Sequence, residues 1–356
     1  MRSLHVITSA TRRGAEVFAR ELVMSLATMG HDPRLVALTA AETPNALAVG
    51  VLGPSRRSPR TLAELRRNAR EVDVVVAHGS STLEACATAL AGTATPFVYR
   101  SIGDPVFWVA PGLRRLGLRL LHRRPARHVA LWDGAAQLLS AHYGLPRERI
   151  DVIPNATPEG HWPVADENRR RAARRYLGVP LDVTCLAFVG ALSPEKDLGA
   201  VLHVTAGLPD ALVLVAGDGP ERPHLESAAE RLPNLRLLGA VDDPGEVYAA
   251  ADLLLLPSRT EGAPGVVIEA GLSGTASVAS AVGALPEMLI DDDTGFLVPP
   301  GDPRALLDRV HQALPRAHRV GQRAAQAFRL RHTMERVAPQ WAQSMARARD
   351  AGDGRQ

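Results

Sequence analysis

The sequence predicts an α/β protein of two tandem, doubly wound Rossmann-like domains that face each other across a cleft. Short apolar runs alternate with helical patterns along the chain, which is typical of parallel sheets covered by helices. This alternation occurs twice, and 356 residues suffice for two domains of ordinary size. Some predicted strands, such as the four leucines at 253–256, are apolar throughout, as in a sheet buried on both faces.

In the first half, apolar runs and helical periodicity predict strands and helices in alternation. The predicted strands are 4–8, 34–38, 72–77 and 97–100, and the predicted helices are 15–29 and 82–90. The second half repeats the pattern with five buried strands, at 185–189, 211–216, 235–238, 253–257 and 276–279.

The boundary between the halves is expected where a strand ends in the turn-forming segment 153–160, which a charged stretch follows. We therefore expect an N-terminal domain at 1–160, which binds the acceptor, and a C-terminal donor domain at 161–330. Residues 331–356 are expected to form a helical tail that packs back across the junction.

The composition is that of a soluble globular protein, with 46% hydrophobic and 22% charged residues. The 41 basic residues nearly balance the 38 acidic ones, so the charge gives no argument for a nucleic-acid partner. The start of the chain does not resemble a signal peptide, and no apolar run is long enough to span a membrane. The two cysteines lie in apolar runs, where buried free thiols are expected. These features predict a cytoplasmic protein.

The segment Glu261-Gly-Ala-Pro-Gly-Val-Val-Ile-Glu269 carries the strongest functional signal. It follows a buried strand, its two glycines let the backbone approach a ligand, and Pro264 suits the first position of a helix. A helix N-terminus presents free N–H groups and partial positive charge, so it can hold a diphosphate. The two glutamates would then meet the sugar and the ribose of a nucleotide-sugar. A loop with two solvated glutamates is the alternative.

Lys196 lies shortly after another buried strand, which ends at Gly190. Ser193 is a candidate N-cap with Pro194 at the first helical position, so Lys196 is expected in the first helical turn. A cation there opposes the helix dipole and costs stability unless an anion lies near. A bound diphosphate would be that anion, and an exposed surface lysine is the alternative.

Together these segments resemble the family-4 retaining glycosyltransferases, which have the GT-B fold. The resemblance covers about residues 5–330 and is most specific over 185–302. An acidic pair with seven residues between its members is a signature of that family, matched here by Glu261 and Glu269. The resemblance implies that Glu261 contacts the donor sugar, Glu269 the ribose and Lys196 the diphosphate.

The resemblance also implies a reaction: a sugar moves from a UDP- or GDP-sugar, with retention of configuration, to a small molecule, a glycan or a glycolipid. It implies no cofactor and no required metal, since the departing phosphate takes the acceptor's proton. Lys196, Glu261 and His78 are the candidate catalytic residues. The donor-binding residues that we expect are Gly14, Gly190, Lys196, Glu261, Gly262, Ala263, Pro264, Gly265, Val266 and Glu269.

The chain departs from the family pattern at two positions. An arginine common in the family is Ala191 here, so one diphosphate cation is missing, for which Arg12, Arg13 or Arg100 is a candidate substitute. A histidine expected in the first domain is Gly103 here. His78, at the end of another strand, is a second candidate for that role, with a purely structural histidine as the alternative. Residues at the same strand end as Gly103 are expected to shape the acceptor site: Arg100, Ser101 and Asp104.

Residues 105–127 form a separate feature, in which leucines and two aromatic residues interleave with arginines. A basic amphipathic helix of this kind can lie on an anionic membrane, which would make the protein peripheral at the inner face of the membrane. A helix packed on its own domain with a solvated basic face is the alternative.

Other functions stay open at this point. A nucleotide-sugar epimerase or a phosphorylase can share the fold. An NAD-dependent dehydrogenase is disfavoured, because the first strand is not followed by Gly-x-Gly-x-x-Gly and the second has no acid at its end. A nucleotide-sugar- or carbohydrate-binding protein without catalysis remains an alternative, given Ala191 and Gly103.

Overall fold

The chain folds into two compact α/β units, which the computed structural model describes over residues 1–41, 46–105 and 113–353. Unit 1 comprises Met1–Thr157 and Met334–Gln356, and unit 2 comprises Pro158–Thr333. The sequence placed the first boundary at residue 160, close to this division. Residues 331–356, expected as a separate tail, belong mainly to unit 1.

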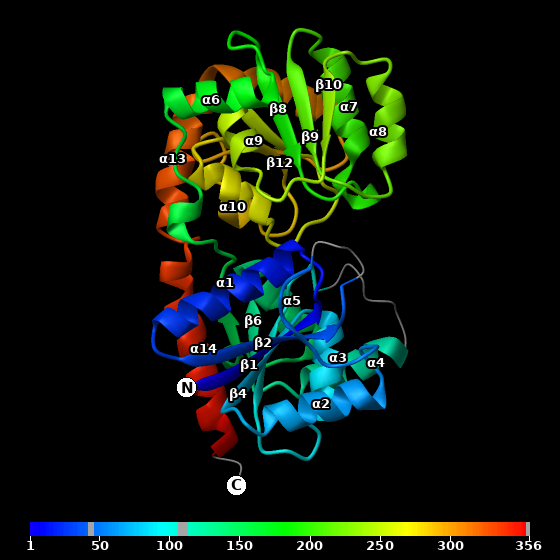
Figure 1. The fold of residues 1–356 in the computed structure, drawn as a ribbon, viewed down its shortest axis with the longest axis vertical. Helices are drawn as coiled ribbons and strands as arrows, with labels where there is room; N and C mark the ends of the chain where they lie inside the picture. The colour runs from blue at the N-terminus through cyan, green and yellow to red at the C-terminus, as the bar shows by residue number, and fades with distance from the viewer. Residues whose placement is uncertain (42–45, 106–112, 354–356) are drawn as a thin grey trace. The chain divides into compact units, whose positions relative to one another are not determined.

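Within its described residues, unit 1 has one parallel sheet of seven strands in the order β3-β2-β1-β4-β5-β6-β7 (Figure 1). The strands are β1 (Arg2–Ser9), β2 (Asp32–Thr39), β3 (Gly50–Val51), β4 (Val74–His78), β5 (Phe97–Arg100), β6 (Arg127–Ala130) and β7 (Ile150–Val152). The helices are α1 (Gly14–Thr28), α2 (Pro59–Ala69), α3 (Ser80–Ala89), α4 (Leu113–His122), α5 (Asp133–Tyr143) and α14 (Met334–Asp353), with a 3₁₀ turn η1 (Arg147–Arg149).

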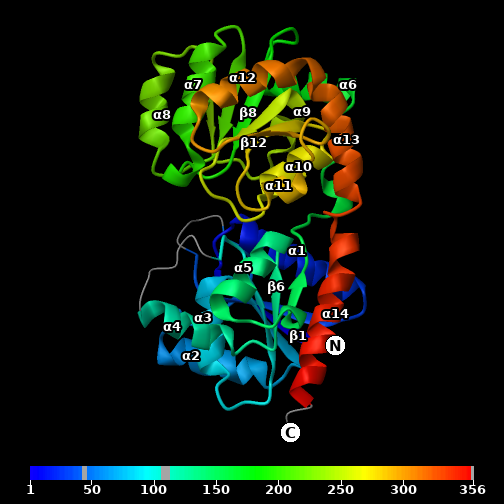
Figure 2. The ribbon, with the colours of Figure 1, turned by 180° about the vertical axis from the view of Figure 1, so that it is seen from behind.

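Strand β4 shows how this sheet is buried on both faces. Val75 and Ala77 pack in a cluster with α2 and α3, whereas Val74 and Val76 pack with α1 and α14. Successive residues of a strand point to opposite faces, so an apolar run such as Val-Val-Val-Ala must be covered on both sides. The last helix, α14, thus supplies part of the cover of the unit 1 sheet, beside α1 (Figure 2).

Unit 2 has a parallel sheet of six strands, counted in its described residues, in the order β10-β9-β8-β11-β12-β13. The strands are β8 (Cys185–Val189), β9 (Leu212–Ala216), β10 (Leu235–Gly239), β11 (Leu253–Leu256), β12 (Ala276–Ser280) and β13 (Phe296–Val298). The helices are α6 (Glu167–Leu177), α7 (Leu198–Gly207), α8 (Arg222–Ala229), α9 (Gly245–Ala250), α10 (Gly265–Leu272), α11 (Leu285–Met288), α12 (Pro303–Ala313) and α13 (Ala317–Arg329), with 3₁₀ turns η2 (Glu159–His161), η3 (Pro194–Lys196) and η4 (Leu314–Arg316).

The fold prediction is confirmed: both units are doubly wound parallel sheets covered by helices. All the strands named from the sequence are present, within two residues at each end. The sequence did not identify the short strands β3, β6 and β13. The helical tail expected at 331–356 contains the helix α14, Met334–Asp353.

Candidate functional site

The predicted donor residues of unit 2 gather where the strand order of its sheet reverses. Strands β8 and β11 are hydrogen-bonded neighbours, with Leu253 paired to Leu186, yet the chain runs from β8 outward to β9 and from β11 outward to β12. Loops that leave the carboxyl ends of two such strands diverge and form a crevice for ligands. Lys196 follows β8 and Glu261 follows β11, so this topology alone brings the two loops together.

Lys196 and Glu261 form an ion pair across these loops. Lys196 Nζ donates to Glu261 Oε1 at 2.6 Å, and the hydroxyl of Ser258 donates to the same oxygen at 2.7 Å. The pair is largely shielded from water, since the lysine side chain is 18% exposed and the glutamate side chain 8%. Ser258 is fully buried, so its side chain has little freedom to move. Its hydrogen bond therefore restricts the position of the Glu261 carboxylate.

The local structure around Lys196 differs from the one that the sequence suggested. Lys196 ends the 3₁₀ turn η3, Asp197 then adopts a left-handed conformation with φ of 51°, and α7 begins only at Leu198. Ser193 makes no capping bond, and its hydroxyl donates to Glu195 Oε1 at 2.6 Å instead. The expected helical turn with Ser193 at the N-cap and Pro194 at its first position is therefore present, but it is a 3₁₀ turn that ends at Lys196. Glu261 compensates its charge even without a bound anion.

A second set of contacts ties the same two loops. The backbone N–H of Arg259 donates to the carbonyl of Glu195 at 2.8 Å. The Arg259 side chain donates through Nε to Asp197 Oδ2 at 3.2 Å. These bonds hold the loop that carries Glu261 against the turn that carries Lys196. The distance between the two charged side chains is therefore restrained by contacts beyond the ion pair itself.

The N-terminus of α10 lies just beyond Glu261. The helix runs from Gly265 to Leu272, and no side chain caps it. Pro264 was expected at the first helical position and is the N-cap instead, with φ of −68° and ψ of 120°. The side chain of Pro264 cannot accept a hydrogen bond from the first turn, so the helix presents the positive end of its dipole beside Glu261.

The backbone at Gly283 packs closely against the backbone of Glu261 and Gly262. The N–H of Ala284 donates to the carbonyl of Gly262 at 2.8 Å. Gly283 has φ of 58°, and a Cβ added there would lie 2.2 Å from the carbonyl oxygen of Glu261. Glycine is therefore required at this position for both its conformation and its lack of a side chain.

Glu269 lies on α10, where the phenol of Tyr248 holds its carboxylate. The Tyr248 hydroxyl donates to Glu269 Oε2 at 2.7 Å. The Glu269 side chain is half-buried, and this burial raises the pKa of its carboxyl, whereas the bond from Tyr248 opposes the rise. The carboxylate is thus costly to keep charged, and any further hydrogen-bond donor to it would favour its charged form.

The predicted donor residue Gly190 closes β8 with φ of 150°. Its carbonyl oxygen lies so near Gly217 of the next loop that a Cβ there would approach within 1.8 Å. The following residue, Ala191, is exposed. The position at which the family often carries an arginine is therefore open to solvent.

In unit 1, His78 and Arg100 lie inside the core. His78 is 2% exposed, with Nε2 at 3.1 Å from His5 Nδ1 and Nδ1 at 3.4 Å from Arg100 Nη1. Its ring also lies against that of Trp341 from α14, with centroids 5.9 Å apart. Burial lowers the pKa of His78 well below its usual value. This geometry favours the structural role that the sequence had left open.

Arg100 is fully buried, which does not favour its expected role in the acceptor site or as the missing diphosphate cation, and both roles remain predictions. Its guanidinium donates to Asn155 Oδ1 at 2.6 Å and stacks over the ring of Phe18 at 3.8 Å. Burial lowers the pKa of Arg100 to about 9. Both neighbours belong to unit 1, so Arg100 ties the end of its sheet to α1.

The other predicted residues of unit 1 lie at strand ends, and their functional roles remain predictions. Ser101 is buried, and its N–H donates to the carbonyl of Val129 at 2.9 Å. Asp104 is half-buried. Gly14 is the exposed first residue of α1, directly after exposed Arg12 and Arg13.

The proposed membrane segment 105–127 lies partly outside the described residues, which omit 106–112. Helix α4 is present at 113–122, and the ring of His122 stacks on Tyr143 with centroids 3.9 Å apart. That face of α4 therefore packs on its own unit, whereas Leu120 is 56% exposed. Membrane contact remains a prediction. None of the described helices combines the length and apolar character needed to cross a bilayer.

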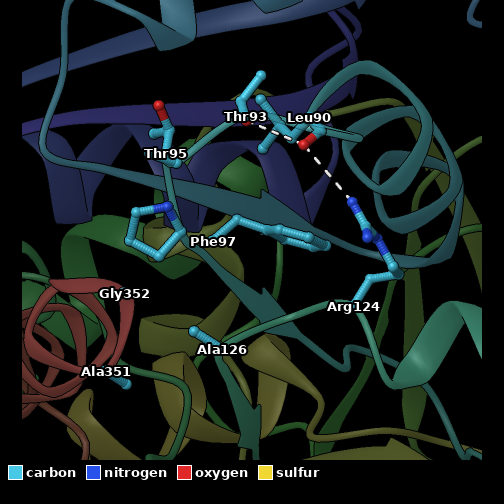
Figure 3. A pocket seen from close by; sticks show the side chains of 10 residues that line it. Leu90, Thr93, Thr95, Phe97, Arg124, Ala126, Ala351 and Gly352 are labelled. Carbon is cyan, nitrogen blue, oxygen red and sulfur yellow. Dashed lines mark hydrogen bonds between the residues drawn. The ribbon is translucent and has the colours of Figure 1, made fainter. Parts of the chain in front are cut away.

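A cavity of about 230 Å³ lies in unit 1 (Figure 3). Its lining includes Pro96 and Phe97 at the start of β5, Arg124, and Gly352 of α14. Arg124 donates to the carbonyl of Leu90, which also accepts from Thr93. The cavity lies at the amino end of β5, whereas ligands of parallel sheets bind at the carboxyl ends. We assign it no role.

No metal centre is evident either. Within residues 1–41, 46–105 and 113–353, no three His, Cys, Asp or Glu side chains are grouped in a way that could hold a metal ion. The independence from metal therefore remains an expectation that only a measurement can test.

Sequence reasoning overlooked three features of this site. Tyr248 and Ser258 both hold predicted acids, but nothing local in the sequence marks them as site residues. The third feature was readable: Lys196 is the only lysine in the chain, and the other 40 basic residues are arginines. Since arginine and lysine differ in shape and hydrogen bonding, a single lysine among arginines indicates a position that needs a compact ammonium.

The comparisons with known proteins cover both units. A family model described as Glycosyltransferase Family 4 matches residues 12–159, and one described as Glycosyl transferases group 1 matches residues 184–315. The D-inositol 3-phosphate glycosyltransferase of Mycolicibacterium smegmatis is 32% identical over 251 residues, 66% of this chain and 57% of that protein. The enzyme of the same name from Mycobacterium tuberculosis is 34% identical over 199 residues, 53% of this chain and 41% of that protein. The aligned region thus spans about half the length of these curated relatives.

Solved structures resemble the chain over nearly its whole length. HepE of Anabaena in complex with UDP has a TM-score of 0.84 at 20% identity and covers 97% of this chain and 100% of its own. Sucrose-phosphate synthase of Thermosynechococcus elongatus has a TM-score of 0.80 at 20% identity, with 96% and 97% covered. At these identities the likeness establishes the fold.

Proposed function

This chain belongs to the family-4 glycosyltransferases, which have the GT-B fold, and we propose that it transfers a sugar from a UDP- or GDP-sugar to an acceptor hydroxyl with retention of configuration. One observation carries the proposal: Lys196, Glu261 and the uncapped N-terminus of α10 meet at the switch point of the unit 2 sheet. A cation, a carboxylate and a helix N-terminus are the groups that a diphosphate-linked sugar requires.

Lys196 and α10 stabilise the departing diphosphate in this proposal. Negative charge develops on the leaving group as the bond to the sugar breaks, and fixed donors that face this charge lower the barrier. An ammonium has three donors, of which Glu261 engages one, so Lys196 retains two for phosphate oxygens. The departing phosphate takes the proton of the acceptor hydroxyl on the same face of the sugar, so the site needs neither a metal nor a protein base.

For the acceptor, we propose a polyol phosphate as the first class to test. The curated relatives carry the name D-inositol 3-phosphate glycosyltransferase and are 32–34% identical over the aligned part. A glycan or a glycolipid remains the alternative acceptor, as the sequence suggested. UDP is the first nucleotide to test, because HepE, a structural neighbour, was solved with UDP bound.

The decisive experiment incubates the protein with UDP-, GDP- and ADP-sugars and measures release of the nucleoside diphosphate, with and without inositol phosphates. Activity with one donor, maintained in EDTA and lost in Lys196→Ala, is the expected result. The anomeric configuration of the product, read by NMR, tests retention. Absence of any binding or turnover with all donors would overturn the proposal.

The single lysine allows a second and independent test. Reductive methylation with ¹³C-formaldehyde labels only Lys196 and the α-amino group at the N-terminus. We expect a saturating nucleoside diphosphate to shift the Lys196 methyl signal and to slow its labelling. The α-amino signal is the internal control and should not change.

A further inference from the structure

Glu269 is held by one carboxylate oxygen only. Tyr248 donates to Oε2 at 2.7 Å, and no group in the described parts of the chain donates a hydrogen bond to Oε1. A Cβ added to Gly265 would lie 3.4 Å from Oε1, so this oxygen reaches back to the first residue of α10. Oε1 is therefore placed at the same helix N-terminus that we assign to the diphosphate.

Tyr248 is itself rigidly fixed. It is fully buried in α9, and its backbone carbonyl accepts a bond from the Thr275 hydroxyl at 2.8 Å. The ring of Trp162 meets it edge-on, with centroids 5.6 Å apart and planes at 70°. Since a tyrosine has only two side-chain torsions and both ends of this residue are held, its hydroxyl is a stationary donor.

We propose that Tyr248 is a positioning residue, which fixes the Glu269 carboxylate so that Oε1 accepts a hydrogen bond from a ribose hydroxyl of the nucleotide. This inference rests on the proposed function. A glutamate has three rotatable bonds, and its ordering costs free energy whenever a ligand must immobilise it. The bond from Tyr248 orders the side chain before the nucleotide arrives.

The same bond affects the charge of Glu269. Burial raises its pKa, the Tyr248 hydroxyl lowers it, and the charge of nearby Asp243 also raises it. Ribose hydroxyls donate to the carboxylate, so nucleotide affinity is full above this pKa and falls as the pH drops through it. Without the hydroxyl the pKa rises further, and the loss of affinity on acidification starts at a higher pH.

The test compares Tyr248→Phe with wild type by calorimetric titration of UDP, GDP and ADP between pH 5 and 8. We expect the best nucleotide to bind about tenfold more weakly to the variant at neutral pH, since hydrogen bonds to charged groups have this order of magnitude. The acid midpoint of binding should move to higher pH. In turnover assays the donor KM should rise while kcat changes little.

Three further variants separate positioning from general destabilisation. Tyr143→Phe removes a matched buried hydroxyl, which donates to the carbonyl of Pro105 in unit 1, and should leave binding unchanged. Glu269→Gln cannot ionise, so its weaker binding should lose the acid midpoint. Trp162→Phe keeps the hydroxyl of Tyr248 but reduces the ring contact, and should give a smaller loss in the same direction.

The outcomes discriminate between the two proposals. Wild-type protein that binds a nucleotide, with Tyr248→Phe equal to it in affinity and acid midpoint, overturns the role of Tyr248 alone. If Tyr248→Phe does not fold, Trp162→Phe with unchanged affinity and midpoint overturns that role equally. Wild-type protein that binds none of the three nucleotides overturns the proposed function, and the positioning role with it.

Discussion

Lys196 Nζ lies 2.6 Å from Glu261 Oε1, and this contact joins the loops that follow two neighbouring strands of one sheet. The two residues are far apart in sequence, and the strand order of unit 2 makes them neighbours. The pair has a structural and a functional consequence. It neutralises a shielded carboxylate, and it holds the ammonium in the position that we propose for diphosphate binding.

We expect Lys196→Ala to reduce turnover by about 10²–10³-fold, the usual effect of removing a group that stabilises charge in the transition state. The free energy of unfolding should also fall by roughly 1–3 kcal/mol, because Glu261 is left shielded and unpaired. Lys196→Arg keeps the charge but not the compact ammonium, so it should recover stability better than activity. Equal activity of wild type and both variants would exclude Lys196 from the donor site.

Ser258→Ala tests the support beneath Glu261. The hydroxyl of this buried serine donates to Glu261 Oε1 at 2.7 Å, so its removal should destabilise the protein by about 1–2 kcal/mol and weaken donor binding several-fold. Ser273→Ala is a matched control, since the hydroxyl of Ser273 is buried and has no hydrogen-bond partner among the described residues, so its loss should be nearly neutral. Chemical denaturation and nucleotide titration measure both effects. A Ser258 variant that behaves like the Ser273 variant would refute the supporting role.

The fold could be predicted because most of its strands are marked by apolar runs within short stretches of sequence. Strands such as Leu253–Leu256 are continuous apolar runs, and any sheet buried on both faces requires them. Strand β6, Arg-His-Val-Ala, mixes polar and apolar residues in only four positions, so its pattern does not distinguish it from a loop. The sequence therefore predicted the two-domain fold but not every strand in it.

The candidate site was predictable only where its chemistry is local in sequence. The two acids of the segment 261–269 have a fixed spacing, and Lys196 follows a recognisable strand and turn. Their partners Tyr248 and Ser258 gain meaning only through tertiary contacts. The role of His78 was undecidable for the same reason, because Trp341, which covers it, comes from the last helix.

Gly283→Ala should displace the loop that carries Glu261 and Gly262. A methyl group there would meet the carbonyl oxygen of Glu261 at 2.2 Å, a backbone contact that only a shift of the loop can relieve. Gly301→Ala is the control, because Gly301 also has a positive φ, 73°, but apart from its own residue and its chain neighbours no described atom lies within 4 Å of the added Cβ.

We expect the control to lose about 1 kcal/mol of stability from backbone strain and to bind nucleotide normally. Gly283→Ala should lose at least about 2 kcal/mol more and should bind nucleotide weakly. Differential scanning calorimetry and titration of a nucleoside diphosphate measure these effects. Equal behaviour of the two variants would show that the close approach to Glu261 is unimportant.

Acid should destabilise unit 1 through its buried histidines. Burial lowers the pKa of His5 to about 3 and that of His122 to about 4, and it lowers those of His78 and His128 well below 6.5. Below pH 6.5 the unfolded chain binds protons that the folded unit excludes, so the free energy of unfolding falls as the pH falls. Each such histidine contributes a slope of up to about 1.4 kcal/mol per pH unit.

Hydrogen exchange between pH 7 and 5 can resolve this loss by unit. Protection of β4 in unit 1 should decrease on acidification more than protection of β11 in unit 2. His5→Gln cannot be protonated and should reduce the pH slope of unit 1, whatever its effect on stability at neutral pH. His224→Gln, at an exposed position, is the control and should leave the slope unchanged. A slope that His5→Gln does not alter would mean that His5 becomes protonated in the folded protein as readily as in the unfolded chain.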